Sequence, residues 1–317
     1  MSPKLTTETL RGIWAGIPLS WDEEYHLDEP AYRENLRRLV EVRPHGIYIF
    51  GSTGEFYAVD DDEFRQVVDI LIEEVCPSGI PTQAGCNALV TREIIDKLKY
   101  VQQAGVDGGQ VALPSWMKLT EQEIVQFWRD ISRAVPDLPL TSYNVSRTKW
   151  YMYGEQYRKI LEVAPNLIGI KWSGSPELDL NRLEQPVAMT PEISHSLGFE
   201  NDLVRGMRFG IRGCYSSWIS AWPQRTLSMF ELADAGRWEE AEAVNSELVE
   251  VAKFIWGMAE DRGLGMMDPI VDKGFGTLTG FLTGHQRTRP PYIGWPDGAL
   301  QEIRQRVAER YPEFIWQ

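Results

Sequence analysis

Cysteine is scarce in this 317-residue chain, and the three that occur, Cys76, Cys86 and Cys214, never stand in a C-x-x-C spacing. An odd number of widely spaced cysteines does not favour a disulfide framework or a redox pair, and it is typical of a reducing compartment. We therefore expect a cytoplasmic protein without structural disulfides.

Histidine is equally sparse. The chain has four, His26, His45, His195 and His285, and they are too scattered to show the spacing of metal ligands. Protein metal sites that use histidine or cysteine need several such side chains within reach of one ion. We expect no metal centre.

Long apolar runs and an excess of positive charge are also lacking. No window approaches about 18 uninterrupted apolar residues, and the polar N-terminus MSPKLTTETLRG has no apolar core of a secretory signal. The net charge of -14 argues against partners that are nucleic acids or anionic membranes. It does not exclude an anionic small-molecule substrate, because a local cluster of donors can oppose the overall field.

What the chain does contain is a repeated alternation of apolar strand-like segments with amphipathic helices such as 29–42, 92–104 and 121–135. Such alternation implies a parallel sheet with right-handed crossovers, and eight units favour closure into a (β/α)₈ TIM barrel. The segments predicted as strands are Gly12–Leu19, Ile47–Phe50, Ile80–Cys86, Gln110–Leu113, Leu138–Tyr143, Ile168–Ser173, Glu192–Ser196 and Ile211–Ser216.

From about Ser220 onward the pattern indicates helices only, near 238–258, 271–281 and 298–311, and a weaker helix is expected near 178–183. No flexible or low-complexity linker separates the two parts. We expect residues 1–219 to form the barrel and residues 220–317 to form a helical region packed on it.

Lys171 stands where the sixth strand should end, in the stretch Ile168–Ser173. A strand lysine commonly lies at a sheet edge or faces solvent. In a parallel barrel, however, reactive groups gather at the carboxyl ends of the strands, where a desolvated lysine amine can be nucleophilic. This segment alone leaves both interpretations open.

Two further strand ends carry polar groups. The second strand is followed by Gly51-Ser52-Thr53-Gly54-Glu55, whose glycines allow close backbone approach and whose hydroxyls and N–H groups suit a carboxylate. The fifth strand ends at Tyr143, whose phenol can move a proton. Each motif also has an ordinary explanation, as a polar turn and as a packed aromatic ring.

Together these motifs resemble the class I aldolase superfamily of dihydrodipicolinate synthase and N-acetylneuraminate lyase. That superfamily carries G-[ST]-T-G-E after the second strand, Y-N-x-P at the end of the fifth and G-x-K on the sixth. The corresponding segments here are Gly51–Glu55, Tyr143–Ser146 and Gly169–Lys171. The resemblance extends over residues 10 to 310 and includes the helical tail.

The resemblance implies that Lys171 forms a Schiff base with pyruvate or another 2-oxo acid, while Tyr143 passes protons to and from the substrate. Ser52, Thr53 and Gly54 would bind the substrate carboxylate. No metal or other cofactor is implied, and relatives are commonly homotetramers or homodimers.

Some positions depart from the family pattern. Trp116 follows Pro114 and Ser115 where dihydrodipicolinate synthases place a tyrosine pair, so lysine-pathway synthesis is not expected. A tryptophan here resembles the hydratase-aldolases that cleave arylidene-pyruvates, in which it walls an aromatic pocket. Those enzymes, however, usually depart from the G-[ST]-T-G-E loop that this chain keeps.

Ser146 replaces the proline of Y-N-x-P, and Arg147 comes one position early, either as a clamp for a second carboxylate or as a surface arginine. Gly198 and Phe199 stand where sugar-acid lyases carry a G-Y-D-E-like run, and Phe199 lacks the phenol that would bind substrate hydroxyls. With Ser217, after the eighth strand, these residues complete the predicted substrate site.

We therefore predict an aldolase or lyase acting on a 2-oxo acid and an apolar or aromatic aldehyde. Cleavage like that of N-acetylneuraminate lyase, dehydration of a deoxy-oxo sugar acid, dihydrodipicolinate synthesis and a non-catalytic sensor barrel are the alternatives.

Overall fold

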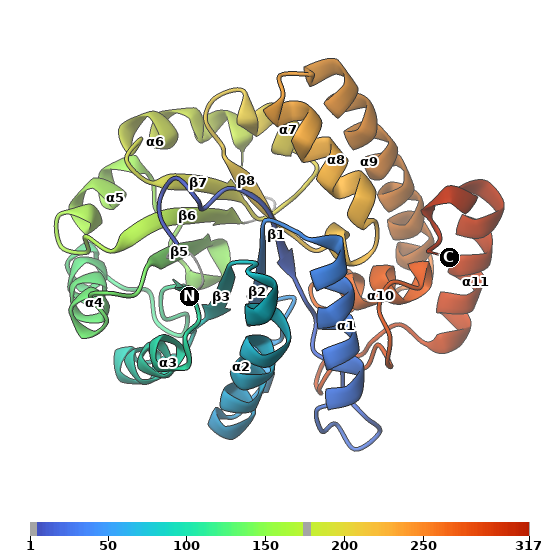
Figure 1. Ribbon diagram of the computed structural model, residues 1–317, viewed down its shortest axis with the longest axis horizontal. Coiled ribbons are helices and arrows are strands. Elements are labelled where there is room, and N and C mark those ends of the chain that lie inside the picture. Colours follow the sequence, from blue (N-terminus) through green and yellow to red (C-terminus); the bar gives the residue numbers. More distant parts are fainter. Residues whose placement is uncertain (1–4, 174–178, 317) are drawn as a thin grey trace.

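The computed structural model describes residues 5–173 and 179–316. Eight parallel strands close into a barrel in sequential order, with β8 paired to β1 through Gly12 and Gly213 (Figure 1). The predicted (β/α)₈ barrel is confirmed. The strands are β1 (Gly12–Gly16), β2 (Gly46–Ile49), β3 (Thr82–Gly85), β4 (Gly108–Val111), β5 (Leu140–Val145), β6 (Leu167–Ser173), β7 (Ser194–Leu197) and β8 (Gly213–Ser216).

Helices cover the outside of the barrel and side chains fill its inside, so nearly all strand residues are buried. Local signals set the helix starts: Asp60 with Glu63, and Thr120 with Glu123, form capping boxes. The outer helices are α1 (Glu29–Val42), α2 (Asp61–Val75), α3 (Thr91–Ala104), α4 (Glu121–Ala134), α5 (Gly154–Leu161), α6 (Glu184–Met189), α7 (Leu203–Met207) and α8 (Pro223–Asp234).

Several predicted segments have other bounds in the structure; the fourth strand, for example, is Gly108–Val111 rather than Gln110–Leu113. The fifth strand runs from Leu140 to Val145 rather than from Leu138 to Tyr143, because its ladder with β6 continues through Asn144 and Val145. The helix expected near 178–183 begins at a residue outside the described ranges. Within them, a short 3₁₀ turn at Leu180–Arg182 precedes α6, whose first turn contains Pro186, a position where proline is tolerated.

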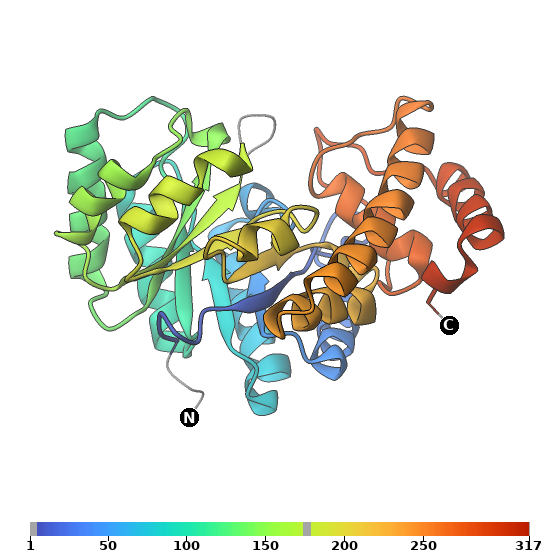
Figure 2. The same ribbon diagram turned by 90° about the horizontal axis from the view of Figure 1, so that it is seen from above.

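The remaining helices, α9 (Trp238–Glu260), α10 (Ile270–Thr279) and α11 (Asp297–Arg310), follow the barrel in the chain. Both ribbon views place α10 and α11 on one side of the barrel (Figure 2). Buried apolar residues of the barrel and of these helices belong to one continuous core, which includes Ile49, Ile255, Phe275 and Ile303. Within the described residues, no helix combines the length and apolar character needed to cross a bilayer.

A buried ion pair joins the loop after β2 to the C-terminal helices. Lys273 of α10 is 2% exposed and donates a hydrogen bond from Nζ to Glu55, which is fully buried. Glu55 also accepts hydrogen bonds from the indole of Trp21 at 2.9 Å and from the backbone N–H of Arg289 at 3.3 Å. Burial lowers the pKa of Lys273, against the opposing effect of Glu55. The acidic residue of the Gly51–Glu55 loop is thus an anchor for α10.

Candidate active site

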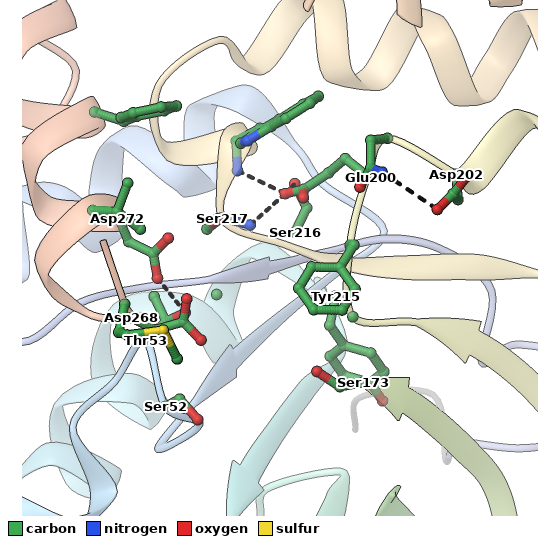
Figure 3. Close-up of a pocket in the computed structure, with 18 of the residues that line it drawn as sticks. Ser52, Thr53, Ser173, Glu200, Asp202, Tyr215, Ser216, Ser217, Asp268 and Asp272 are labelled. Carbon is green, nitrogen blue, oxygen red and sulfur yellow. Dashed lines mark hydrogen bonds between the residues drawn. The ribbon is translucent and has the colours of Figure 1, made fainter. Parts of the chain in front are cut away.

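A cavity of about 1140 Å³ opens at the carboxyl ends of the strands, between the barrel and the C-terminal helices. One wall carries polar side chains from the strand ends and the loops after them. The other is built by α9, α10 and the residues just before α10 (Figure 3). In barrels of this type the carboxyl ends of the strands are where catalytic groups are placed.

Lys171 points into this cavity from β6 and is only 6% exposed. Its amine donates to the hydroxyl of Tyr48 at 3.3 Å and lies 4.3 Å, 4.8 Å and 5.1 Å from the ring centroids of Tyr143, Tyr48 and Tyr215. Among the described residues, no carboxylate lies within ion-pair distance of it. Within this part of the chain Lys171 is therefore a buried amine without a counter-ion, and it is not a solvent-facing lysine at a sheet edge.

Tyr143 lies directly beside Lys171, because these two residues are register partners on the adjacent strands β5 and β6. Its hydroxyl is 3.2 Å from the Ser52 hydroxyl, which in turn accepts a hydrogen bond from the Arg147 guanidinium at 3.0 Å. Arg147 also lies 3.8 Å from Asp268. The structure thus brings Lys171, Tyr143, Ser52 and Arg147 into one connected group.

Thr53 faces the C-terminal wall. Its hydroxyl donates to Oδ2 of Asp272 on α10 at 2.6 Å (Figure 3). Asp272 is 7% exposed, and its burial together with the negative charge of Asp268 raises the pKa of its carboxyl to about 7, although the hydrogen bond from Thr53 opposes the rise. Sequence reasoning missed both aspartates, because their partners lie in a distant loop.

The model of the Dihydrodipicolinate synthetase family matches residues 9–261 of the chain. The protein belongs to this family. Similar proteins include synthases, lyases and aldolases, so membership of the family supports an enzymatic role.

The chain is 25% identical over 286 residues to a 4-hydroxy-tetrahydrodipicolinate synthase of Thermus thermophilus, a match covering 90% of this chain and 91% of the relative. It is 24% identical over 311 residues to the trans-o-hydroxybenzylidenepyruvate hydratase-aldolase of Pseudomonas aeruginosa, covering 94% and 91% of the two chains. Relatives with different activities thus match to a similar degree.

Solved structures show the same fold. A prophage protein of this family from E. coli K12, in complex with pyruvate, superposes with a TM-score of 0.84 at 20% identity and covers 95% of this chain and 98% of its own. The N-acetylneuraminate lyase of Fusobacterium nucleatum superposes with a TM-score of 0.82 at 21% identity, covering 96% and 99%.

In this protein Trp116, which was predicted to form part of the substrate site, does not line the cavity. It is 74% exposed, and its backbone carbonyl accepts a hydrogen bond from Lys149. The aromatic rings that do line the cavity include the predicted Phe199, together with Trp218, Trp256 and Phe275. Trp256 and Phe275 belong to α9 and α10, so the C-terminal helices supply the aromatic wall.

The two glycines of the loop after β2 have packing roles. Gly54, predicted to bind substrate, does not line the cavity, and a Cβ on it would lie 2.7 Å from the backbone nitrogen of Phe50. A Cβ on Gly51 would overlap the Tyr48 hydroxyl, which is the hydrogen-bond partner of Lys171. Gly51 therefore makes room for a tyrosine of the site.

Ser217 lines the cavity as predicted, and Glu200 shapes the segment that carries it. The buried carboxylate of Glu200 accepts hydrogen bonds from the Ser216 hydroxyl at 2.6 Å and from the backbone N–H groups of Ser217 and Trp218 at 2.7 Å and 2.8 Å. Burial raises the pKa of Glu200, while these hydrogen bonds oppose the rise. No local sequence pattern marks Glu200 for this role, because its hydrogen-bond partners follow the next strand.

Gly198 leaves the space that the lysine side chain occupies. A Cβ there would lie 2.7 Å from the Ser173 side chain and 3.1 Å from Cε of Lys171. We expect Gly198→Ala to displace Lys171 and to lower the rate of its covalent reaction with a 2-oxo acid by at least about tenfold, since small misplacements of reacting groups are costly. Rates of borohydride trapping with pyruvate measure this. Gly298→Ala, in the first turn of α11 where a Cβ would meet nothing within 4 Å, is the control, and equal trapping rates in the two variants would contradict the expectation.

Proposed function

We propose that the protein is a Schiff-base-forming lyase or aldolase, in which Lys171 reacts with the carbonyl carbon of pyruvate or a related 2-oxo acid and a carbon–carbon bond is made or broken. The observation that carries this proposal is the environment of Lys171. Its amine is buried, has no counter-ion among the described residues, and lies beside the phenol of Tyr143.

The chemistry follows from this arrangement. The neutral amine of Lys171 adds to the carbonyl carbon, and the resulting carbinolamine loses its oxygen as water to leave a protonated imine. The positive nitrogen then accepts the electron pair of the breaking C3–C4 bond, while the C4 hydroxyl loses its proton and becomes the carbonyl of the aldehyde. Protonation at C3 and addition of water release the 2-oxo acid and restore the lysine.

Tyr143 is the group placed to carry protons in these steps. Its ring lies against the Lys171 amine, and its hydroxyl is hydrogen-bonded to Ser52 at 3.2 Å, which orients the phenol. The carboxylate of the 2-oxo acid would be held by Ser52 and Thr53, with the Arg147 guanidinium next to Ser52.

The remaining part of the cavity supports an apolar or aromatic aldehyde as the second reactant. Phe199, Trp218, Trp256 and Phe275 present rings to it, and aromatic surfaces bind flat apolar groups well. This resembles a hydratase-aldolase in substrate class, with the aromatic wall supplied by the C-terminal helices.

A second candidate is cleavage or dehydration of a sugar acid, favoured by the polar residues Asn245, Ser246 and Lys253 that α9 contributes to the lining. Product NMR separates the two candidates. Release of an aromatic aldehyde and pyruvate from an arylidene-pyruvate, after water has added across its C3=C4 bond to give the C4 hydroxyl, supports the first, whereas activity confined to deoxy-oxo sugar acids supports the second.

Borohydride reduction in the presence of pyruvate tests the chemistry common to both candidates. A stable adduct on the peptide that contains Lys171, located by mass spectrometry, is the expected result. Absence of any adduct at Lys171 would overturn the proposed function.

A further inference from the structure

The hydroxyl of Thr53 is engaged by a carboxyl group of α10. A threonine hydroxyl has one hydrogen, and here it is donated to Asp272 at 2.6 Å. While Asp272 is ionised, Thr53 therefore has no hydroxyl hydrogen to offer to a substrate carboxylate. Thr53 could hold that carboxylate only through its backbone N–H.

The charges around Asp272 make it sensitive to a further anion. Asp268 precedes α10 and lies close to it, and Glu200, after β7, adds negative charge from the barrel. Tyr48 of β2 also lies near Asp272. The cations that line the same cavity are Lys171, Lys253 and Arg147, and Arg147 lies 3.8 Å from Asp268. A substrate carboxylate bound at Ser52 and Thr53 would add a further negative charge beside Asp272, which already has Asp268 and Glu200 near it.

We propose that Asp272 is a positioning residue that takes up one proton when the 2-oxo acid binds. The proton removes the repulsion between two adjacent carboxylates and frees the Thr53 hydroxyl to donate to the substrate. This inference rests on the proposed function, because it assumes that the substrate carboxylate lies at Ser52 and Thr53.

The direction of the pH dependence follows from linkage. In the free protein burial and Asp268 raise the pKa of Asp272 to about 7, and a bound carboxylate would raise it further. Well below pH 7 the residue is largely protonated before binding, so affinity depends little on this group. Above pH 7 the proton is taken from solution, and affinity falls as pH rises, by at most about tenfold per pH unit for one proton.

Calorimetry on the full-length protein tests this. Pyruvate is titrated at pH 8 in buffers of different ionisation enthalpy, which counts the protons taken up. We expect the wild-type protein to take up nearly one proton more than Asp272→Asn, and the variant to lack the fall in pyruvate affinity between pH 7 and 8.5. Any proton exchanged in forming the imine at Lys171 is common to both proteins and cancels in the comparison.

Asp268→Asn serves as the matched control, since it removes the neighbouring charge and leaves the Thr53–Asp272 hydrogen bond. In this variant pyruvate binding should still be coupled to proton uptake, and the fall in affinity should begin at a lower pH. Wild-type protein that takes up no proton at pH 8, or the same uptake in wild type and Asp272→Asn, would overturn the inference. If the asparagine variant does not fold, the comparison of wild type with Asp268→Asn decides the matter, because an unchanged onset of the pH dependence in that variant would mean that Asp272 is not the group that takes up the proton.

Borohydride trapping separates this inference from the proposed function. Trapping of pyruvate at Lys171 without proton uptake by Asp272 would refute the inference and leave the function standing. Failure of pyruvate to bind or to be trapped would overturn both.

Discussion

Replacing Lys171 by alanine is expected to abolish covalent trapping of pyruvate and to lower the rate of carbon–carbon cleavage on the order of 10⁴-fold or more, the scale seen when a covalent nucleophile is removed. Lys171 supplies the amine that lies beside Tyr143, and without it no imine can accept the electrons of the breaking bond. Mass spectrometry of the reduced complex and a continuous assay of aldehyde release provide the two measurements.

Two matched variants sharpen this result. Lys171→Arg places a positive charge in the cavity but cannot form an imine, so it should be as inactive as the alanine variant if charge alone is insufficient. Tyr143→Phe keeps the amine and should still be trapped, but turnover should fall by about 10²- to 10⁴-fold through loss of proton transfer. The assignment would be contradicted if Lys171→Ala trapped pyruvate on another lysine to the same extent as the wild-type protein.

Replacing Glu55 by alanine is expected to lower the free energy of unfolding by about 3–5 kcal/mol, because it leaves a buried ammonium group without its partner. Lys273 is 2% exposed, and the substitution would also strand the Trp21 indole N–H, which donates to Glu55. The substitution should affect stability more than catalytic activity, since Glu55 itself does not line the cavity. Urea denaturation at neutral pH measures it.

The double variant Glu55→Leu with Lys273→Met is the informative partner, since replacing both charges by apolar groups of similar size often restores the stability lost by removing one. Glu309→Ala, which removes an exposed partner of Arg306, is a surface control expected to be nearly neutral. The anchoring role of Glu55 would be disproved if Glu55→Ala lost no more stability than Glu309→Ala.

Local patterns were enough to predict the barrel and most of its chemical groups. Alternating strand and helix periodicities identify each unit separately, and parallel strands necessarily bring their carboxyl ends to one face. Lys171, Tyr143, Ser52 and Thr53 are brought to one face by that topology, because each lies within four residues of the carboxyl end of its own strand. Their convergence required no knowledge of side-chain packing.

The direction of a side chain on a loop is a different matter. Trp116 follows the fourth strand by only a few residues, yet it faces outward and is 74% exposed. Gly54 stands between the cavity residue Thr53 and the anchor Glu55 but packs against the backbone of Phe50. The order of the strands does not predict the orientation of either residue, because the conformation of a loop depends on the residues that pack around it.

The sequence by itself determined the eight-stranded barrel and the placement of Lys171, Tyr143 and the Ser52–Thr53 pair near strand ends that share one face. Only the tertiary structure decided the far wall. Asp272 and Lys273, in the first turn of α10, carry no local mark of their partners Thr53 and Glu55, which lie more than 200 residues away in the chain. The physical reason is that those contacts depend on how a C-terminal helix docks on the barrel, which is set by the shared core rather than by any local pattern.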